Sequence, residues 1–249
     1  MRRAFLGLLF GAGLFLLMGM LWKENGLGIS GFSGERDRAS HVSEDMPGDG
    51  SFIARLDTSR RKDGSAPVVA LTFDDGPHPV YTEWLLDGLK ERNIKATFFL
   101  IGVNVEGHED IVERIAAEGH LIGNHTYSHV QLTSVSDHEA CREIDEANAT
   151  LTAACGSVIH YIRPPFGSWP KDLDSLTDMQ VVLWSVDPLD WKRKDTDAVV
   201  KAVLEDVKDG DIILLHDVYK TSVEAAFQII DRLTEEGYEF VRVDELLLD

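Results

Sequence analysis

Hydrophobic and polar positions divide the chain into three stretches with different patterns. Positions 4–22 carry no charged residue, positions 24–66 hold scattered apolar residues without a period, and from position 67 short apolar runs alternate with amphipathic segments. Short apolar runs rich in β-forming residues predict buried strands, and apolar residues three and four apart predict helices. The pattern therefore predicts two N-terminal segments (1–23 and 24–66) and one α/β domain (67–249).

The domain from position 67 onward contains seven predicted strands with helices between them. The predicted strands are Val68–Phe73, Ala96–Ile101, His120–Gly123, Ile159–Ile162, Val181–Val186, Asp211–Leu215 and Glu239–Val243. The predicted helices are Tyr81–Arg92, Glu109–Glu118, Asp137–Ala154, Lys171–Asp178, Thr196–Lys208 and Ser222–Glu236. Alternating strands and helices favour a parallel sheet, in either an α/β barrel or an open doubly wound arrangement. No Gly-x-Gly-x-x-Gly loop follows the first strand, which disfavours a dinucleotide-binding domain.

The N-terminal stretch predicts a transmembrane helix. Arg2 and Arg3 precede about 19 uncharged residues, close to the ~20 that a helix needs to cross a bilayer. We expect an uncleaved signal anchor, with a cleaved signal peptide as the alternative, because a signal-peptide core is usually only about 7–15 residues long. The domain from position 67 onward would then lie on the extracytoplasmic side of the cell membrane, or be secreted. Residues 24–66 are expected to form a flexible linker with weak order around Phe52–Leu56.

Charge and cysteine content limit the partners. The formal net charge of -19 disfavours nucleic acid as a partner but is compatible with a neutral glycan or a metal cation. No protein partner is evident. Cys141 and Cys155 lie near the two ends of one predicted helix, roughly 20 Å apart, beyond the ~7 Å that a disulfide allows between Cα atoms. Both cysteines are expected to be free thiols.

Chemically versatile side chains gather after the carboxyl ends of five predicted strands. They lie in the segments Asp74–Asp75, Asn124–His129, Arg163–Gly167, Asp187–Trp191 and His216–Asp217. The carboxyl ends of parallel strands share one face, where the active sites of such folds are built. The alternative for each segment alone is a polar turn that ends a strand. Their common location favours a single site.

Two histidines and the acidic turn predict a metal site. His125 and His129 are four residues apart, a spacing that on one helical turn would direct both imidazoles to the same side. Two nitrogens and one carboxylate oxygen describe a catalytic zinc site with open positions, although other divalent metals fit such a set. The remaining histidines are expected to be structural or exposed.

Further residues on this face suggest proton transfer and sugar binding. Asp190 could orient His216 and keep it basic enough to deliver a proton, the alternative being a strand-end histidine held by backbone groups. The Pro-Pro segment fixes the direction of Arg163, which beside Asp74 would keep that carboxylate ionised; the alternative is a surface charge. Trp191 suits stacking on a sugar, or covers the core as a rim aromatic.

Five motifs resemble, in order and spacing, those of the polysaccharide deacetylase family, also called the nodulation-type deacetylase domain or carbohydrate esterase family four. The motifs are Thr-Phe-Asp-Asp-Gly, His-Thr-x-x-His, Arg-Pro-Pro-Phe-Gly, Asp-x-x-Asp-Trp and Leu-Leu-His. The resemblance covers about Pro67 to Asp249. It implies a distorted (β/α)7 barrel and a metal-dependent hydrolase that removes N-acetyl groups from N-acetylglucosamine-type residues.

The resemblance also implies a role for each site residue. Three would hold the metal: Asp75, His125 and His129. Four would serve proton transfer: Asp74 as general base, Arg163 orienting or ionising it, His216 as general acid, and Asp190 holding that histidine. Three would contact the substrate: Phe166 through its backbone N–H, and Trp191 and Leu214 as the lining of the pocket. The family often has Tyr where this chain has Phe166, and the loss of a hydroxyl should matter little because the backbone makes the contact.

The expected location points to a substrate. An exported, tethered enzyme meets the peptidoglycan around it, so peptidoglycan is the first expectation. A chitooligosaccharide deacetylase and an O-acetyl-xylan esterase with the same site are alternatives. A catalytically silent glycan-binding envelope protein is a more distant one, since no ligand or base of the motifs is missing. The expected metal is zinc, with cobalt, nickel or manganese as alternatives.

Overall fold

A computed structural model describes residues 52–59, 61–62 and 64–245 of the chain. The predicted transmembrane anchor (residues 1–23) and most of the predicted linker lie outside these residues. No helix within the described part combines the length and the apolar character that crossing a bilayer requires.

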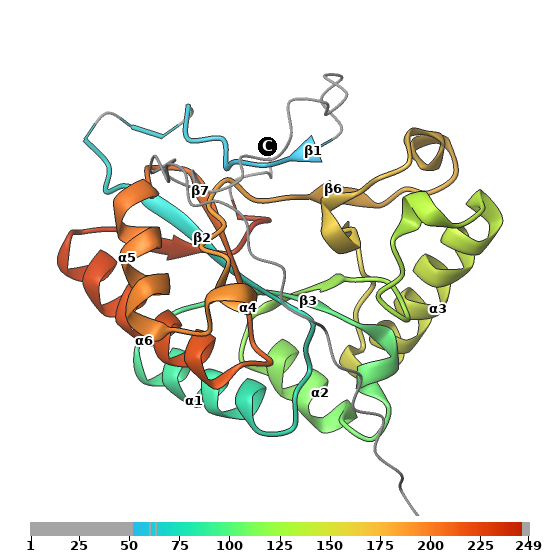
Figure 1. Cartoon of the computed structure of the whole chain (residues 1–249), viewed down its shortest axis with the longest axis horizontal. Coiled ribbons are helices and arrows are strands. Elements are labelled where there is room, and N and C mark those ends of the chain that lie inside the picture. Colours follow the sequence, from blue (N-terminus) through green and yellow to red (C-terminus); the bar gives the residue numbers. More distant parts are fainter. Residues whose placement is uncertain (1–51, 60, 63, 246–249) are drawn as a thin grey trace, which may run out of the picture. The chain divides into compact units, whose positions relative to one another are not determined.

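A parallel sheet forms the centre of the described unit (Figure 1). Its strands are β1 (Phe52–Ile53), β2 (Val68–Asp74), β3 (Thr97–Leu100), β4 (Leu121–Asn124), β5 (Tyr161–Ile162), β6 (Gln180–Val182), β7 (Asp211–His216) and β8 (Glu239–Val241). Their order is β1-β6-β5-β4-β3-β2-β7, and β8 pairs with β2. A parallel bridge between Val186 and Ile213 links the chain after β6 to β7. The predicted α/β fold with a parallel sheet is confirmed, and β2 to β8 are its seven predicted strands.

The remaining strand, β1, lies inside the segment predicted to be a linker. Phe52 and Ile53 pair in parallel with Val181 and Val182 of β6. Arg55 forms a salt bridge with the buried carboxylate of Asp211. These contacts tie the segment around Phe52–Leu56 to the sheet.

Helices cover the outside of the strands. They are α1 (Tyr81–Glu91), α2 (Glu109–Ala117), α3 (Asp137–Cys155), α4 (Asp190–Arg193), α5 (Thr196–Asp206) and α6 (Lys220–Glu235). Short 3₁₀ turns are η1 (Gly102–Val105), η2 (Leu132–Ser134), η3 (Pro165–Gly167) and η4 (Lys171–Ser175). Figure 1 shows α5, α6, α1, α2 and α3 following one another around the strands. Both cysteines are free thiols, as predicted.

One predicted helix, Lys171–Asp178, is wrong. Only the 3₁₀ turn η4 forms there. The segment is rich in Asp, Ser and Thr, whose side chains compete with helical hydrogen bonds by binding nearby backbone and side-chain groups. The Ser175 hydroxyl donates to the Asp172 carbonyl, and Asp174 accepts from the Trp169 indole N–H.

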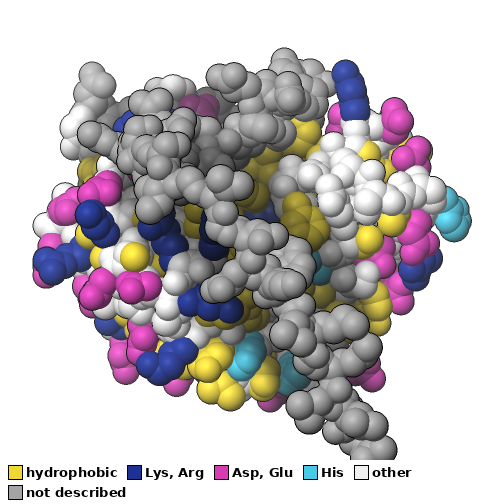
Figure 2. Space-filling model, in the orientation of Figure 1, with side chains coloured by type: hydrophobic (Ala, Val, Ile, Leu, Met, Phe, Trp, Pro, Cys, Tyr) yellow, Lys and Arg dark blue, Asp and Glu magenta, His cyan; other side chains and the backbone are white. Residues whose placement is uncertain are grey.

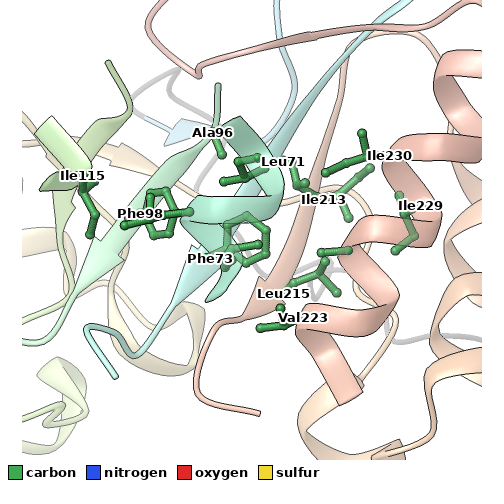
Figure 3. Packing of buried hydrophobic residues seen from close by; sticks show 14 of the residues in the cluster. Leu71, Phe73, Ala96, Phe98, Ile115, Ile213, Leu215, Val223, Ile229 and Ile230 are labelled. Carbon is green, nitrogen blue, oxygen red and sulfur yellow. The ribbon is translucent and has the colours of Figure 1, made fainter. Parts of the chain in front are cut away.

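The alternation of side chains along β2 separates the core from the site. Leu71 and Phe73 face the outer helices and belong to one core cluster with Ile213 and Leu215 of β7 and Ile229 of α6 (Figure 3). The alternate positions from Val68 to Asp74 face the inside of the sheet, and all of β2 is buried. This inner face is apolar at the start of the strand and polar at its end, because Thr72 and Asp74 follow Val68 and Ala70. The polar side chains of the site therefore begin at the carboxyl end of β2.

Charged side chains of both signs are interspersed on the outer helices. Figure 2 shows this mixture over the region of α5 and α6. Ion pairs one helical turn apart join Lys201 to Glu205 and Lys220 to Glu224. Such exposed pairs stabilise a fold by only about 0–1 kcal/mol each, so this surface contributes mainly to solubility.

Candidate active site

The two adjacent aspartates diverge where β2 ends. Asp74 is the last residue of the strand and is only 3% exposed. Asp75 has a φ of 75°, in the left-handed region, so its side chain does not continue the alternation of the strand. The Asn104 side chain donates to the Asp75 carbonyl at 2.9 Å and holds this backbone turn. The two carboxylates are thus free to take different roles, as predicted.

The segment from His125 to His129 is a loop, so the expectation of a helical turn was wrong. Thr126 and His129 have φ values of 63° and 60°, which no right-handed helix contains. The Asn124 side chain accepts the Thr126 N–H at 2.6 Å, which satisfies the backbone without a helix. The buried Glu143 accepts both the backbone N–H and the hydroxyl of Ser128, at 2.7 and 2.9 Å. The loop still brings the two imidazoles together.

Asp75, His125 and His129 converge as the sequence predicts. One ligand atom of each lies within 4.8 Å of the other two. Asp75 Oδ1 lies 3.5 Å from His125 Nε2 and 3.4 Å from His129 Nε2. The Nδ1 of His125 lies 2.6 Å from the Arg163 carbonyl oxygen, to which it can donate, and this directs its Nε2 at the cluster.

The pKa shifts of Asp75 and His129 favour the forms of these two residues that bind a metal ion. Burial by itself raises the pKa of Asp75, but the hydrogen bond and the charge of His125 outweigh it and lower that pKa to about 2. Burial, followed by the charge of His125, lowers the pKa of His129. An ionised carboxylate and neutral imidazoles are the forms that bind metals. The donor set therefore fits a divalent cation with two nitrogen ligands and one oxygen ligand.

Arg163 is buried and holds Asp74 from the inside of the sheet. Its Nη1 donates to Asp74 Oδ1 at 2.8 Å and to Thr72 Oγ1 at 2.7 Å. Its guanidinium stacks 4.2 Å from the centre of the Phe99 ring. Gly123 leaves the space for that ring, since a Cβ there would lie 2.5 Å from it. The predicted contact between Arg163 and Asp74 is confirmed.

Asp190 and His216 form the second predicted pair. His216 Nδ1 lies 2.8 Å from Asp190 Oδ1, and the His216 backbone N–H donates to Asp190 Oδ2 at 2.9 Å. Burial lowers the pKa of His216, but the hydrogen bond and the charge of buried Asp190 outweigh it and raise that pKa to about 9. The imidazole is therefore protonated at neutral pH and can act as an acid.

The three predicted substrate-contacting residues lie around these groups. Phe166 is 66% exposed, has a φ of 61°, and its ring centre lies 5.0 Å from that of His129. Trp191 is 46% exposed and directly follows Asp190, whose Oδ1 accepts its backbone N–H. Leu214 is buried in β7.

A buried carboxyl that the sequence reading left without a role lies behind the acidic turn. Asp217 accepts a hydrogen bond from the Thr82 hydroxyl, and its Oδ1 has no hydrogen-bond partner among the described residues. A Cβ on Gly76 would lie 2.6 Å from Asp217 Oδ2, so only glycine allows the turn to pass this close. Burial raises the pKa of Asp217 to about 7. The only sign in the sequence that Asp217 belongs near the site is its position directly after His216.

Comparisons with known proteins identify the family of this chain. A family model described as polysaccharide deacetylase matches residues 61–182. The chain is 42% identical over 166 residues to the chitooligosaccharide deacetylase of Sinorhizobium fredii, covering 65% of this chain and 77% of that protein. The chain belongs to the polysaccharide deacetylase family. The family resemblance read from the five motifs is confirmed.

Two further matches concern PdaC, a peptidoglycan-N-acetylmuramic acid deacetylase of Bacillus subtilis. The chain is 41% identical to it over 194 residues, 78% of this chain but only 42% of PdaC, so the chain matches less than half of that relative. A solved PdaC structure covers 75% of this chain and 92% of the solved chain, with a TM-score of 0.72 and 40% identity. This polysaccharide deacetylase domain thus has the fold of PdaC.

Proposed function

We propose that the protein is a metal-dependent polysaccharide N-deacetylase that acts on peptidoglycan. The observation that carries the proposal is the convergence of the Asp75–His125–His129 cluster with a buried base candidate, Asp74, and a protonated acid candidate, His216. Asp74 Oδ2 lies 3.7 Å from His125 Nε2, and Asp74 and His216 are paired positions of β2 and β7. Family membership supports the same reaction.

Asp75, His125 and His129 hold the metal in this proposal. When bound, a divalent cation supplies Lewis-acid activation of a water molecule and of the acetyl carbonyl. Family members are metal-dependent in general, and the nitrogen and oxygen donors here favour zinc, with cobalt, nickel or manganese as alternatives.

Asp74 is the general base and takes a proton from the attacking water. Arg163 supports this role because its charge-assisted hydrogen bond favours the ionised carboxylate and fixes its direction. The backbone N–H of Phe166 donates to the oxygen of the carbonyl as negative charge develops there.

His216 is the general acid. An amine leaves a tetrahedral carbon only when its nitrogen is protonated, and His216, held by Asp190, donates that proton through Nε2. The C–N bond then breaks to give acetate and a free amine on the sugar. Trp191 and Leu214 line the pocket for the sugar ring and the acetyl methyl group.

Peptidoglycan is the proposed substrate, and the outer face of the cell membrane is the proposed location. Support comes from the uncharged stretch 4–22 and from PdaC, whose name specifies peptidoglycan. Residues 1–23 would act as a single-pass anchor. Chitooligosaccharides are the second candidate, supported by the S. fredii relative.

Acetate release tests the proposal. The protein is incubated with purified peptidoglycan and, in parallel, with chitooligosaccharides and acetyl-xylan, each with and without a chelator. We expect chelator-sensitive acetate release from peptidoglycan. Release from chitooligosaccharides alone would favour the second candidate, and no release from any substrate would contradict a catalytic role.

A further inference from the structure

Three consecutive cations lie at the end of α4 and directly after it. Lys192, Arg193 and Lys194 come directly after Asp190 and Trp191, and all three are exposed. The side chains of Lys192 and Arg193 make no hydrogen bond or ion pair with any residue that the structure describes. This cationic segment (Lys192–Lys194) is therefore available to an external anion.

The cationic segment is one of two runs of three cations in the chain, the other being Arg60–Lys62 before β2. The formal net charge is -19, and cations on the outer helices, such as Lys201 and Lys220, pair with acidic neighbours (Figure 2 shows the mixed surface). Three like charges in a row repel one another. Because no carboxylate of the described residues pairs with Lys192 or Arg193, these two cations can attract an anionic ligand at short range.

The segment lies beside the proposed catalytic acid. Asp190 bonds His216, and Lys194 Nζ lies 5.0 Å from the centre of the Tyr219 ring. The Tyr219 ring centre lies 6.4 Å from that of His216. A polymer bound at His216 would therefore run close to the cationic segment.

Lysine and arginine are absent from four of the loops on this face, and Lys171 lies in the segment that follows β5. The loops 75–80, 101–108, 125–136 and 217–219, which follow β2, β3, β4 and β7, contain neither Lys nor Arg. Arg163 is buried and pairs with Asp74. The cationic segment therefore adds positive charge beside the site that the deacetylation chemistry does not require.

We propose that the cationic segment binds carboxylates of the glycan strand and so selects a carboxylate-bearing glycan over a neutral one. The inference rests on the proposed deacetylase function and names its substrate class. Peptidoglycan carries carboxylates on its peptides and on those lactyl ethers that bear no peptide, whereas chitin carries none. Exposed charge pairs are individually weak, so the loss of two cations should lower the preference for the charged glycan by about threefold to tenfold.

The test compares two variants of equal charge change in the full chain. K192S/R193S removes the two unpaired cations of the segment. K62S/K208S removes two exposed lysines that precede β2 and β7, at the opposite ends of the strands, and serves as the control. The ligand is soluble peptidoglycan fragments, either with free carboxylates or with these converted to amides. Binding is measured by calorimetry at low and at high salt, and acetate release is measured separately.

We expect the parent and K62S/K208S to bind the free-carboxylate form more tightly at low salt, and K192S/R193S to lose most of that preference. Equal affinity of the parent for both forms would overturn the inference, as would an equal loss in both variants. Absence of acetate release together with a carboxylate preference that K192S/R193S abolishes would refute the deacetylase function and leave the binding role supported.

Discussion

Asp74 and His216 occupy paired positions on the neighbouring parallel strands β2 and β7. Two residues earlier in the same register, Thr72 is paired with Leu214 and donates its hydroxyl to the Ile213 carbonyl at 2.7 Å. The last residues of two buried strands thus place a carboxylate and an imidazole next to each other. Their relative position is set by backbone pairing and does not depend on loop conformation.

Replacing Asp74 by Asn should separate metal binding from turnover. The amide keeps the shape and can still accept from Arg163, but it cannot take a proton, so we expect kcat to fall by about 10²–10⁴-fold. Metal content, measured by mass spectrometry, should stay at the parent level because Asp75, His125 and His129 are intact. Asp178→Asn, an exposed site, should behave like the parent. Near-normal turnover in Asp74→Asn would contradict its role as base.

Removing the metal should abolish acetate release and lower thermal stability. A ligand that binds only the folded state at 100 times its Kd adds about 2.7 kcal/mol to the free energy of unfolding. We expect zinc to raise the melting temperature of the chelator-treated protein and to restore its activity. His129→Ala should lose both effects, whereas the exposed His138→Ala should keep them. An unchanged zinc response in His129→Ala would exclude it as a ligand.

The alkaline limb of the pH–rate profile should report on His216. The acid form is the active form, so kcat/KM should fall as pH rises through about 9, the raised pKa of this group. Asp190→Asn removes the charge that raises this pKa, and the limb should move toward the ordinary value near 6.5. The same raised pKa stabilises the fold below about 6.5, and this contribution is lost as pH rises through about 9. An unshifted limb in Asp190→Asn would argue against His216 as the titrating acid.

Arg163→Leu should destabilise the fold strongly. It leaves the Asp74 carboxylate buried without its partner and frees the carbonyls of Val182 and Leu183, to which the guanidinium donates. We expect a loss of about 3–5 kcal/mol in the free energy of unfolding, measured by urea denaturation. Arg232→Leu, on the exposed surface of α6, should change it by less than about 0.5 kcal/mol. Equal effects of the two substitutions would show that the buried pair contributes little.

Asp217→Asn should become increasingly favourable as pH rises. The folded-state pKa of Asp217, about 7, exceeds its ordinary value of 3.8. The unfolded chain therefore ionises this group at lower pH than the folded protein does, and the free energy of unfolding falls as pH rises from about 3.8 to about 7. The amide cannot ionise, and we expect its stability relative to the parent to improve by on the order of 2 kcal/mol between pH 5 and pH 9. Urea denaturation in chelator-containing buffer measures this. A pH-independent difference would show that Asp217 is ionised in the fold throughout.

Much of the fold could be predicted because its signals are local. Buried strands such as β2 and β7 are largely apolar runs, and glycines mark the ends of helices such as α3, which is followed by Gly156 with a φ of 72°. The parallel arrangement then places all carboxyl ends on one face, which was enough to bring Asp75, His125 and His129 together. The helix at Lys171–Asp178 failed because its polar side chains bond locally instead.

The amino-acid sequence by itself determined the strands, the face that carries the site and the residues that meet there, since periodicity and strand polarity are properties of neighbouring positions. Only the tertiary structure decided that β1 joins β6, that the histidine loop is not helical, and that Asp217 is buried against Gly76. These features depend on contacts between residues far apart in the chain, such as Thr82 with Asp217, and on left-handed backbone conformations at Thr126 and His129. The identity of a side chain specifies neither its distant contacts nor a left-handed backbone conformation, because burial and the surrounding hydrogen bonds decide both.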